Sequence, residues 1–340
     1  MSLQERINAF VKVGLFINRH FNIPLLHENH LHLGLNKVIE TAFLHNRWFN
    51  PNFVNAAIQN IGIMLIEDKI IAFCNNKESS KQKTVAIICA GNIPMVGFHD
   101  TMCVLLSGHK VLLKLSSDDN VLLPFFIKLL VHYEPQLESS ILFSESKLSN
   151  FDAVIATGSN NSSLHFTYYS AKYPHIIRKN RNSLAILTGN ETKQDFKNLG
   201  ADIFTYYGLG CRNVSKIFAP LNYSFNLFFE SIIDFDFVIE NNKYKNNYDY
   251  HRAIYLLEQI PFLDNNFLML RENENLHSPV AVLHYQFYKD ETELQIQLEL
   301  NMENIQCIIG KNHIPFGYSQ QPVISDFADN MNTSEFLLSL

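Results

Sequence analysis

The sequence has 340 residues, of which 47% are hydrophobic, and a formal net charge of -6 at pH 7. This length exceeds the usual size of one domain, so two globular domains are expected. The negative charge argues against a nucleic-acid interface, and Arg178, Lys179 and Arg181 form only a short basic cluster. No apolar run reaches the roughly 18 residues of a membrane span, and Glu5 and Arg6 stand where a signal peptide would be apolar. We therefore expect a soluble, cytoplasmic protein with no nucleic-acid partner.

Cysteine and histidine spacing bears on disulfides and metals. The five cysteines are odd in number and have no C-x-x-C spacing, which fits a reducing compartment and neither a disulfide framework nor a zinc site. His27, His30 and His32 lie close together, but a zinc site needs three or four converging ligands. The neighbouring Pro24 and Gly34 favour a loop, so we predict no metal site.

The first part of the chain is predicted to be helical. Apolar residues between Leu3 and Phe21 fall on one face of a helix. Asn50 followed by Pro51 is typical of an N-cap with proline at the first helical position. A polar run at residues 75–83 ends this helical part.

From Thr84 the pattern changes to apolar runs that alternate with helical segments. The predicted strands are residues 85–89, 111–115, 141–143, 151–156 and 184–187, and in the second half 217–219, 267–270, 280–283 and 305–309. Buried strands alternating with helices predict an α/β fold with a parallel sheet, whose ligands bind at the carboxyl ends of the strands. Neither G-x-G-x-x-G nor G-x-x-x-x-G-K-[ST] occurs, so the pattern alone leaves a nucleotide ligand unproven.

A Gly-Leu-Gly-Cys turn stands before an apolar run in the second half. Glycine takes backbone angles closed to other residues and lets a ligand come close, so this turn could display Cys211 as a nucleophile. A helical turn starting at Cys211, together with the cation of Arg212, would favour the thiolate. The alternative is a buried, inert cysteine. The neighbouring Phe204, Tyr206 and Tyr207 either line an acyl channel or, as is usual for large aromatic residues, fill the core.

Four stretches, taken in order, resemble the landmarks of the aldehyde dehydrogenase superfamily: residues 85–94, residues 107–116, the turn Thr157-Gly158-Ser159, and residues 208–211. The form Tyr-Tyr-Gly-Leu-Gly-Cys-Arg-Asn-Val-Ser is most similar to the acyl-CoA reductase family, related to the fatty-acid reductase subunit of bacterial luminescence. The resemblance covers roughly residues 50 to 320. It implies N-terminal helices and a Rossmann-type NADP-binding domain at residues 1–187, an α/β catalytic domain at 188–320 and a C-terminal tail at 321–340.

The resemblance also implies roles for individual residues. Cys211 matches the nucleophile that forms a thioester with the acyl group. Asn92 matches the amide that, with the Cys211 backbone N–H, holds the developing oxyanion; the alternative is a turn asparagine. Lys114 matches a lysine that contacts the adenosine ribose, although a lysine that ends a strand can also snorkel to solvent. The implied cofactor-binding residues are Lys114, Ser116, Ser117, Thr157, Gly158, Ser159 and Pro279.

Three departures from the family pattern concern cofactor and direction. Ser117 replaces the glutamate that follows the lysine by three residues in NAD-preferring members, so NADPH is permitted. No Asp or Glu occurs from Tyr173 to Asn190, the region where oxidative members keep a general base. Without a positioned base, activating water is difficult, whereas reducing a thioester needs no water. Residues 274–280 resemble the stretch that holds the nicotinamide ribose in the family, but Asn275 takes the place of its glutamate.

The function implied by the resemblance is NADPH-dependent reduction of a fatty acyl thioester to the aldehyde through a covalent acyl-cysteine. The thioester partner is acyl-CoA or an acyl carrier protein. Two alternatives stay open: an oxidative aldehyde dehydrogenase, and a cofactor-free acyl-transfer or non-catalytic partner protein. The sequence also leaves a homodimer open.

Overall fold

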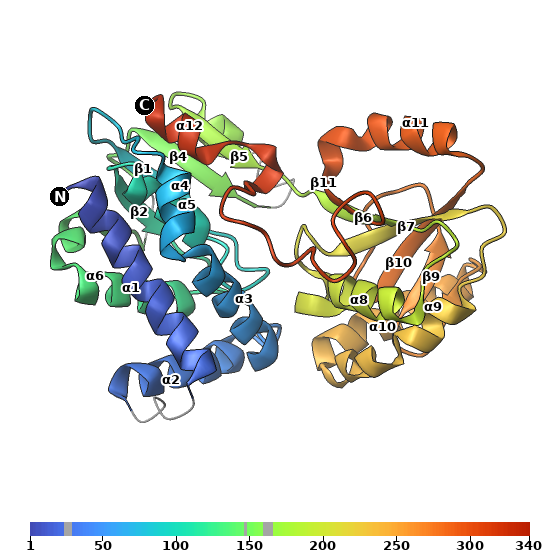
Figure 1. Ribbon diagram of the computed structural model, residues 1–340. Helices are drawn as coiled ribbons and strands as arrows, with labels where there is room; N and C mark the ends of the chain where they lie inside the picture. The colour runs from blue at the N-terminus through green and yellow to red at the C-terminus, as the bar shows by residue number, and fades with distance from the viewer. Residues whose placement is uncertain (24–28, 146–147, 159–165) are drawn as a thin grey trace. The chain divides into compact units, whose positions relative to one another are not determined.

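The computed structural model describes residues 1–23, 29–145, 148–158 and 166–340, and its chain divides into two compact units (Figure 1). Unit 1 comprises Met1–Lys179 and Pro322–Leu340, and unit 2 comprises Asn180–Gln321. The division predicted from the sequence lay at residue 187. It falls earlier in the structure because strand β6 (Asn182–Ile186) hydrogen-bonds with other strands of unit 2. The C-terminal segment, expected as a separate tail, is part of unit 1.

Unit 1 begins with helices whose first turns are capped by side chains. They are α1 (Leu3–Asn22), α2 (His30–His45), α3 (Pro51–Met64) and α4 (Glu67–Cys74). At the start of α1, Ser2 and Glu5 form a capping box, in which each side chain accepts a hydrogen bond from the other's backbone N–H. The side chain of Asn50 caps α3 by accepting from Asn52 N at 2.9 Å. The two predicted helices are thus confirmed.

The histidine-rich segment differs from the predicted loop. His30 and His32 lie in the first turn of α2, because Asn29 acts as its N-cap and accepts a hydrogen bond from Leu31 N at 3.0 Å. His32 is buried, and its Nδ1 lies 3.0 Å from Nδ1 of His20. His27 lies outside the described residues. Among the residues that are described, no group of three or more His, Cys, Asp or Glu side chains could hold a metal ion.

A parallel sheet forms the centre of unit 1. Its strand order is β3-β2-β1-β4-β5, and its members are β1 (Thr84–Ile88), β2 (Lys110–Lys114), β3 (Ile141–Phe143), β4 (Ala153–Thr157) and β5 (His175–Arg178). Between them lie α5 (Phe98–Leu106), α6 (Leu122–Tyr133) and the 3-10 helix η2 (Pro135–Ser140). Order and parallel pairing are those of a Rossmann-type sheet, as expected. Ile88 pairs with Lys114 and Ala156, so the carboxyl ends of β2, β1 and β4 share one edge.

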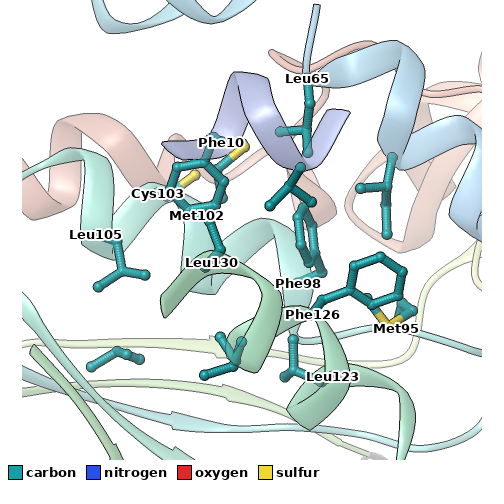
Figure 2. Packing of buried hydrophobic residues seen from close by; sticks show 14 of the residues in the cluster. Phe10, Leu65, Met95, Phe98, Met102, Cys103, Leu105, Leu123, Phe126 and Leu130 are labelled. Carbon is teal, nitrogen blue, oxygen red and sulfur yellow. The ribbon is translucent and has the colours of Figure 1, made fainter. Parts of the chain in front are cut away.

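The core of unit 1 lies between this sheet and the helices. Helix α1 packs against α3, α4, α5 and α6. Figure 2 shows Phe10, Phe98 and Phe126 among the core residues, where Phe98 meets each of the other two rings edge to face, at centroid distances of 6.4 and 6.2 Å. Burying one such side chain contributes about 1.5–3 kcal/mol. These contacts therefore hold α1, α5 and α6 against one another.

The C-terminal segment is joined to unit 1 by buried polar contacts. Helix α12 (Thr333–Leu338) packs on α5, and a 3-10 turn, η6 (Ala328–Asn330), precedes it. Arg178 at the end of β5 is ion-paired with Asp100 and donates a hydrogen bond to Thr333 Oγ1 at 2.9 Å. His109 Nε2 donates to the carbonyl oxygen of Leu337 at 2.9 Å. Side chains from three distant parts of the sequence thus meet in one buried network.

Unit 2 contains a second sheet with helices on both sides (Figure 1). Its strand order is β11-β6-β7-β10-β9-β8, parallel except for the pair β8 and β9. Besides β6, the strands are β7 (Val214–Pro220), β8 (Leu263–Asp264), β9 (Met269–Glu272), β10 (Val282–Tyr288) and β11 (Ile305–Ile309). The helices are α8 (Lys193–Phe204), α9 (Asn226–Ser231), α10 (Asn242–Leu257) and α11 (Glu291–Asn301), with 3-10 turns η3 (Thr205–Gly208), η4 (Ile233–Glu240) and η5 (Met302–Asn304).

The α/β fold class is confirmed, with small shifts of individual elements. Strand β11 has the predicted bounds, whereas β9 and β10 begin two residues later than predicted. Helix α10 begins at Asn242, because Asn241 caps it by accepting a hydrogen bond from Lys243 N at 2.9 Å. No helix in the described parts of the chain is long and apolar enough to cross a membrane.

Candidate active site

Cys211 lies in a turn between α8 and β7. The chain leaves α8 through Tyr206, Tyr207 and Gly208, whose φ angles are 54°, 55° and 78°. Such left-handed angles are unusual for tyrosine and common for glycine. Three of them in succession end the helical path of the chain, and Cys211 follows as a half-buried residue. The two tyrosines and Phe204 are buried, which favours the core role over an acyl channel.

Asn213 holds this turn together from inside. Its side-chain Nδ2 donates to the carbonyl oxygens of Asp202, Ile203 and Thr205 at 3.0, 3.3 and 2.7 Å. Its Oδ1 accepts from Gly210 N at 2.8 Å. One buried amide therefore ties the end of α8 to the glycine directly before Cys211. The sequence analysis missed this residue, although its place two residues after the candidate nucleophile was a usable signal.

The backbone and neighbour of Cys211 are also held. Ser183 Oγ donates to the carbonyl oxygen of Cys211 at 2.9 Å. Arg212 Nε donates to the carbonyl oxygen of Ser319 at 2.5 Å. No helix begins at Cys211, because residues 211–213 are a turn that leads straight into β7. The helical contribution to thiolate formation that the sequence left open is thus absent.

Most of the other thiols are disfavoured as nucleophiles by their surroundings. Desolvation by burial raises the pKa of Cys74 to about 11 and that of Cys89 to about 12. It also raises the pKa of Cys103, which is almost completely buried. Cys307 is buried with its Sγ 2.9 Å from Ser183 Oγ. Since the thiolate is the reactive form, Cys74, Cys89 and Cys103 are poor nucleophiles at neutral pH.

The candidate cofactor residues of unit 1 gather at the carboxyl edge of the first sheet. Lys114 ends β2, and Thr157 ends β4, on either side of β1. Ser116 and Ser117 follow β2, and Ser117 is exposed. A cation and three hydroxyl groups at this edge suit the ribose and phosphate groups of a dinucleotide. Gly158 follows Thr157, and Ser159 lies outside the described residues.

The turn that carries Asn92 lies at the same edge. A Cβ on Gly91 would stand 2.5 Å from Ser116 Oγ, so glycine is needed where the turn after β1 passes the turn after β2. Asp119 Oδ2 accepts a hydrogen bond from Met95 N at 2.9 Å, and Met95 has a φ of 65°. Asn92 itself is exposed between these two anchors. The structure thus brings Asn92 to the edge that carries Lys114 and Thr157.

Asp119 was not among the predicted site residues. It is buried, and its Oδ1 has no hydrogen-bond partner among the described residues. Desolvation raises the pKa of this carboxyl to about 6, while the hydrogen bond from Met95 N opposes the shift. An aspartate shortly after a buried strand was its only sequence signal.

Pro279, the remaining candidate cofactor residue, is in unit 2. It lies in the turn before β10, where its carbonyl oxygen accepts from Val282 N at 3.1 Å. Asn275, four residues earlier, is exposed. Cys211 and Pro279 thus belong to one unit, and Asn92, Lys114 and the other described candidates to the other.

The stretch from Tyr173 to Asn190, which contains no Asp or Glu, runs through β5 and β6. Two carboxylates from elsewhere in the sequence contact it. Asp100 is paired with Arg178 in a buried ion pair, and Asp329 Oδ2 accepts a hydrogen bond from Lys179 N at 3.1 Å. Asp100 is therefore already paired with Arg178 and is poorly suited to act as a general base.

Comparisons with known proteins agree with this description. The model of the family described as acyl-CoA reductase (LuxC) matches residues 71–222. The matched segment contains Asn92, Lys114 and Cys211, so the resemblance found in the sequence is confirmed. A comparison with curated protein sequences gave no match.

Solved aldehyde dehydrogenase structures are similar to most of the chain. One is the NAD+ complex of an aldehyde dehydrogenase from Bacillus cereus, with 12% identity, a TM-score of 0.62, and coverage of 91% of this chain and 72% of that one. An NAD-dependent benzaldehyde dehydrogenase from Corynebacterium glutamicum has 10% identity, a TM-score of 0.65 and coverages of 87% and 74%. Aldehyde dehydrogenase 21 from Physcomitrella patens, in complex with succinate, has 14% identity, a TM-score of 0.62 and coverages of 92% and 74%.

At these identities the likeness establishes the fold, which is that of aldehyde dehydrogenases. With the family match, it supports an oxidoreductase of the acyl-CoA reductase and aldehyde dehydrogenase type.

Proposed function

We propose that the protein reduces a fatty acyl thioester to the aldehyde with NADPH, through an acyl group carried on Cys211. The observation that carries this proposal is the turn built around Asn213, which places a half-buried thiol after two glycines. The family match over residues 71–222 supports acyl-CoA as the substrate class. An acyl carrier protein thioester has the same reacting group.

The chemistry at Cys211 takes place in two stages. The Cys211 thiolate attacks the carbonyl carbon of the thioester, the carbon–sulfur bond to the carrier breaks, and the carrier leaves as a thiol after protonation. A bound nicotinamide supplies the hydride that reduces the resulting enzyme thioester. The thiohemiacetal on Cys211 then collapses, which breaks the bond to Sγ and releases the aldehyde. In both stages the carbonyl oxygen gains negative charge, and we assign Asn92 and the Cys211 N–H to hold it.

The residues at the carboxyl edge of the first sheet fit a dinucleotide. We assign Lys114 and the hydroxyl groups of Ser116, Ser117 and Thr157 to its adenosine half, and Pro279 to its nicotinamide half. Ser117 places no carboxylate against a 2′-phosphate, which favours NADPH. Asp118, the residue after Ser117, is exposed, and its carboxylate would repel a 2′-phosphate bound near Ser117. The choice between NADPH and NADH is therefore tested by substitutions at both positions.

Acylation in the absence of cofactor tests the proposal directly. Incubation with a fatty acyl-CoA, followed by intact-mass and peptide analysis, is expected to show one acyl group on Cys211. Adding NADPH is expected to remove that group and release aldehyde. Cys211→Ala should abolish acylation, whereas Cys74→Ala, which removes the other half-buried thiol, should leave it unchanged.

The same experiment separates the alternatives. Acylation of Cys211 that NADPH does not reverse would favour the cofactor-free acyl-transfer protein. No acylation, combined with formation of free acid from an aldehyde and NADP, would favour the oxidative aldehyde dehydrogenase. Acylation that persists in Cys211→Ala would refute the assignment of the nucleophile.

A further inference from the structure

Four successive backbone carbonyl groups in unit 2 are each bound by a side chain. Ser215 Oγ donates to the carbonyl oxygen of Leu276 at 2.8 Å, and His284 Nδ1 donates to that of Asn275 at 3.0 Å. Lys216 Nζ donates to the carbonyl oxygens of Asn273 and Glu274, both at 2.8 Å. The donors come from the neighbouring strands β7 and β10, so the backbone of residues 273–276 is fastened to the sheet.

Lys216 is the unusual member of this set. Its side chain is completely buried, and its third contact is Gln286 Oε1 at 2.7 Å. An ammonium group has three donors, and here all three meet neutral oxygens. Desolvation lowers the pKa of Lys216 to about 8, with the charge of Glu274 opposing the shift. Burying an ammonium group is costly unless its donors are satisfied, so this geometry is specified by the surrounding acceptors.

The fastened segment is connected to the Cys211 turn. Ser183 Oγ holds the carbonyl oxygen of Cys211, and Ser215 Oγ lies within 3.4 Å of the carbonyl oxygen of Ser183 while it holds Leu276. Glu274 and Asn275 themselves are exposed. The segment then continues to Pro279. Residues 273–276 thus form a rigid stretch in the same unit as the thiol.

We propose that Lys216 is a positioning residue, which holds the 273–276 segment in the conformation that binds the nicotinamide half of the cofactor. This inference rests on the function proposed above. Lys216 touches neither substrate nor cofactor and acts through the backbone that it binds. Loss of its ammonium group should loosen the segment and weaken cofactor binding, while the Asn213 turn stays intact and Cys211 is still acylated.

Two variants and a control test this assignment. Lys216→Met keeps an unbranched side chain that reaches the ε position and removes all three hydrogen bonds. Gln286→Leu removes one acceptor only, and serves as the milder variant should Lys216→Met fail to fold. Lys289→Met removes an exposed lysine of the same unit and is the control. For each protein, hydrogen exchange of peptides covering residues 273–277, acylation of Cys211 by acyl-CoA without cofactor, and the KM for NADPH are measured.

We expect exchange at residues 273–277 to accelerate and the KM for NADPH to rise by about tenfold or more in Lys216→Met, as a charge-assisted network is lost. Gln286→Leu should change both in the same direction by less, and acylation should stay within about twofold of the wild type in either variant. Unchanged exchange in Lys216→Met and Gln286→Leu would overturn the proposal, as would equal losses of acylation and cofactor binding. If the wild type neither acylates nor oxidises NADPH, the proposed function fails, and the exchange measurement still reports whether Lys216 holds the segment.

Discussion

The side-chain amide of Asn213 donates a hydrogen bond to the carbonyl oxygen of Thr205 at 2.7 Å, across the two glycines that precede Cys211. The same side chain accepts from Gly210 N. A short turn with a glycine at each of two positions has much conformational freedom when unfolded. One buried amide with four partners removes this freedom in the folded state, and so determines where the thiol is presented.

Asn213→Ala is expected to destabilise the protein by about 2–4 kcal/mol, because buried backbone groups lose their partners. It should also slow acylation of Cys211 by about tenfold or more, since a displaced nucleophile reacts poorly. Asn213→Asp keeps the acceptor for Gly210 N and loses the donors to the three carbonyl oxygens. We expect both stability and the rate of acylation to fall in this variant as well. Asn246→Ala, at an exposed position of α10, is the control. Chemical denaturation and the acylation assay measure the two effects; equal behaviour of the Asn213 and Asn246 variants would contradict this role.

Asn92→Ala is expected to lower turnover by about a hundredfold or more, the usual effect of removing one oxyanion donor. NADPH affinity should stay nearly unchanged, because Gly91 and Asp119 hold the turn without the Asn92 side chain. Steady-state kinetics and fluorescence titration with NADPH distinguish the two quantities. A parallel fall in binding and turnover would instead identify Asn92 as a structural turn residue.

Ser117→Glu is expected to reverse or flatten a preference for NADPH, because a carboxylate at this exposed position repels a 2′-phosphate. The effect should shrink with added salt, as screening weakens interactions between exposed charges. Asp118→Asn is the matched variant, since it removes the neighbouring carboxylate and should raise NADPH preference. The ratio of kcat/KM for NADPH and NADH reports both changes. No response to either substitution would place the 2′-phosphate elsewhere.

An aldehyde and NADP, without a thiol acceptor, are expected to yield little free acid. The stretch from Tyr173 to Asn190 has no carboxylate, and Asp100 is already paired with Arg178. Added coenzyme A should release acyl-CoA, because a thiol can attack the acyl-enzyme without a base for water. Free acid formed at steady state would indicate a base from another part of the chain. Asp329→Asn would then show whether the carboxylate that contacts Lys179 N supplies it.

Asp119 is expected to make stability depend on pH. Its pKa is raised from 3.8 to about 6 on folding, so between these values the folded chain holds a proton that the unfolded chain releases. The contribution of this group to stability is therefore present at low pH and is lost as the pH rises through about 6. A shift of about two units corresponds to about 3 kcal/mol at most. Asp119→Asn keeps an acceptor for Met95 N and stays neutral.

Denaturation of both proteins at pH 4, 5, 6 and 7 tests this sign. The free energy of unfolding of Asp119→Asn, relative to the wild type, should rise by about 1–3 kcal/mol between pH 4 and pH 7. A constant difference would mean that the Asp119 carboxyl titrates alike in the folded and unfolded chains.

Much of the fold could be predicted from the sequence because its signals are local. The apolar face of α1, the cap at Asn50 and the apolar runs of the strands depend on residues within one or two turns of each other. The turn before Cys211 was found in the same way, from glycine chemistry. The start of α2 was missed although Asn29 caps it, because nearby proline and glycine favoured a loop.

The buried polar contacts of both units depend on tertiary structure. Arg178 and Asp100 are 78 positions apart in the sequence, and Lys216 meets Gln286 across 70 positions. No local pattern distinguishes a lysine that reaches solvent from one that is enclosed by three oxygens. The difference is decided by which strands become neighbours, here β7 beside β10, and by desolvation once they pack. The sequence by itself determined the elements and the chemistry of the thiol turn, whose main side-chain support, Asn213, is local. Only the packing of distant segments decided that Ser183 binds the backbone of Cys211 and that Lys216 is buried among oxygens.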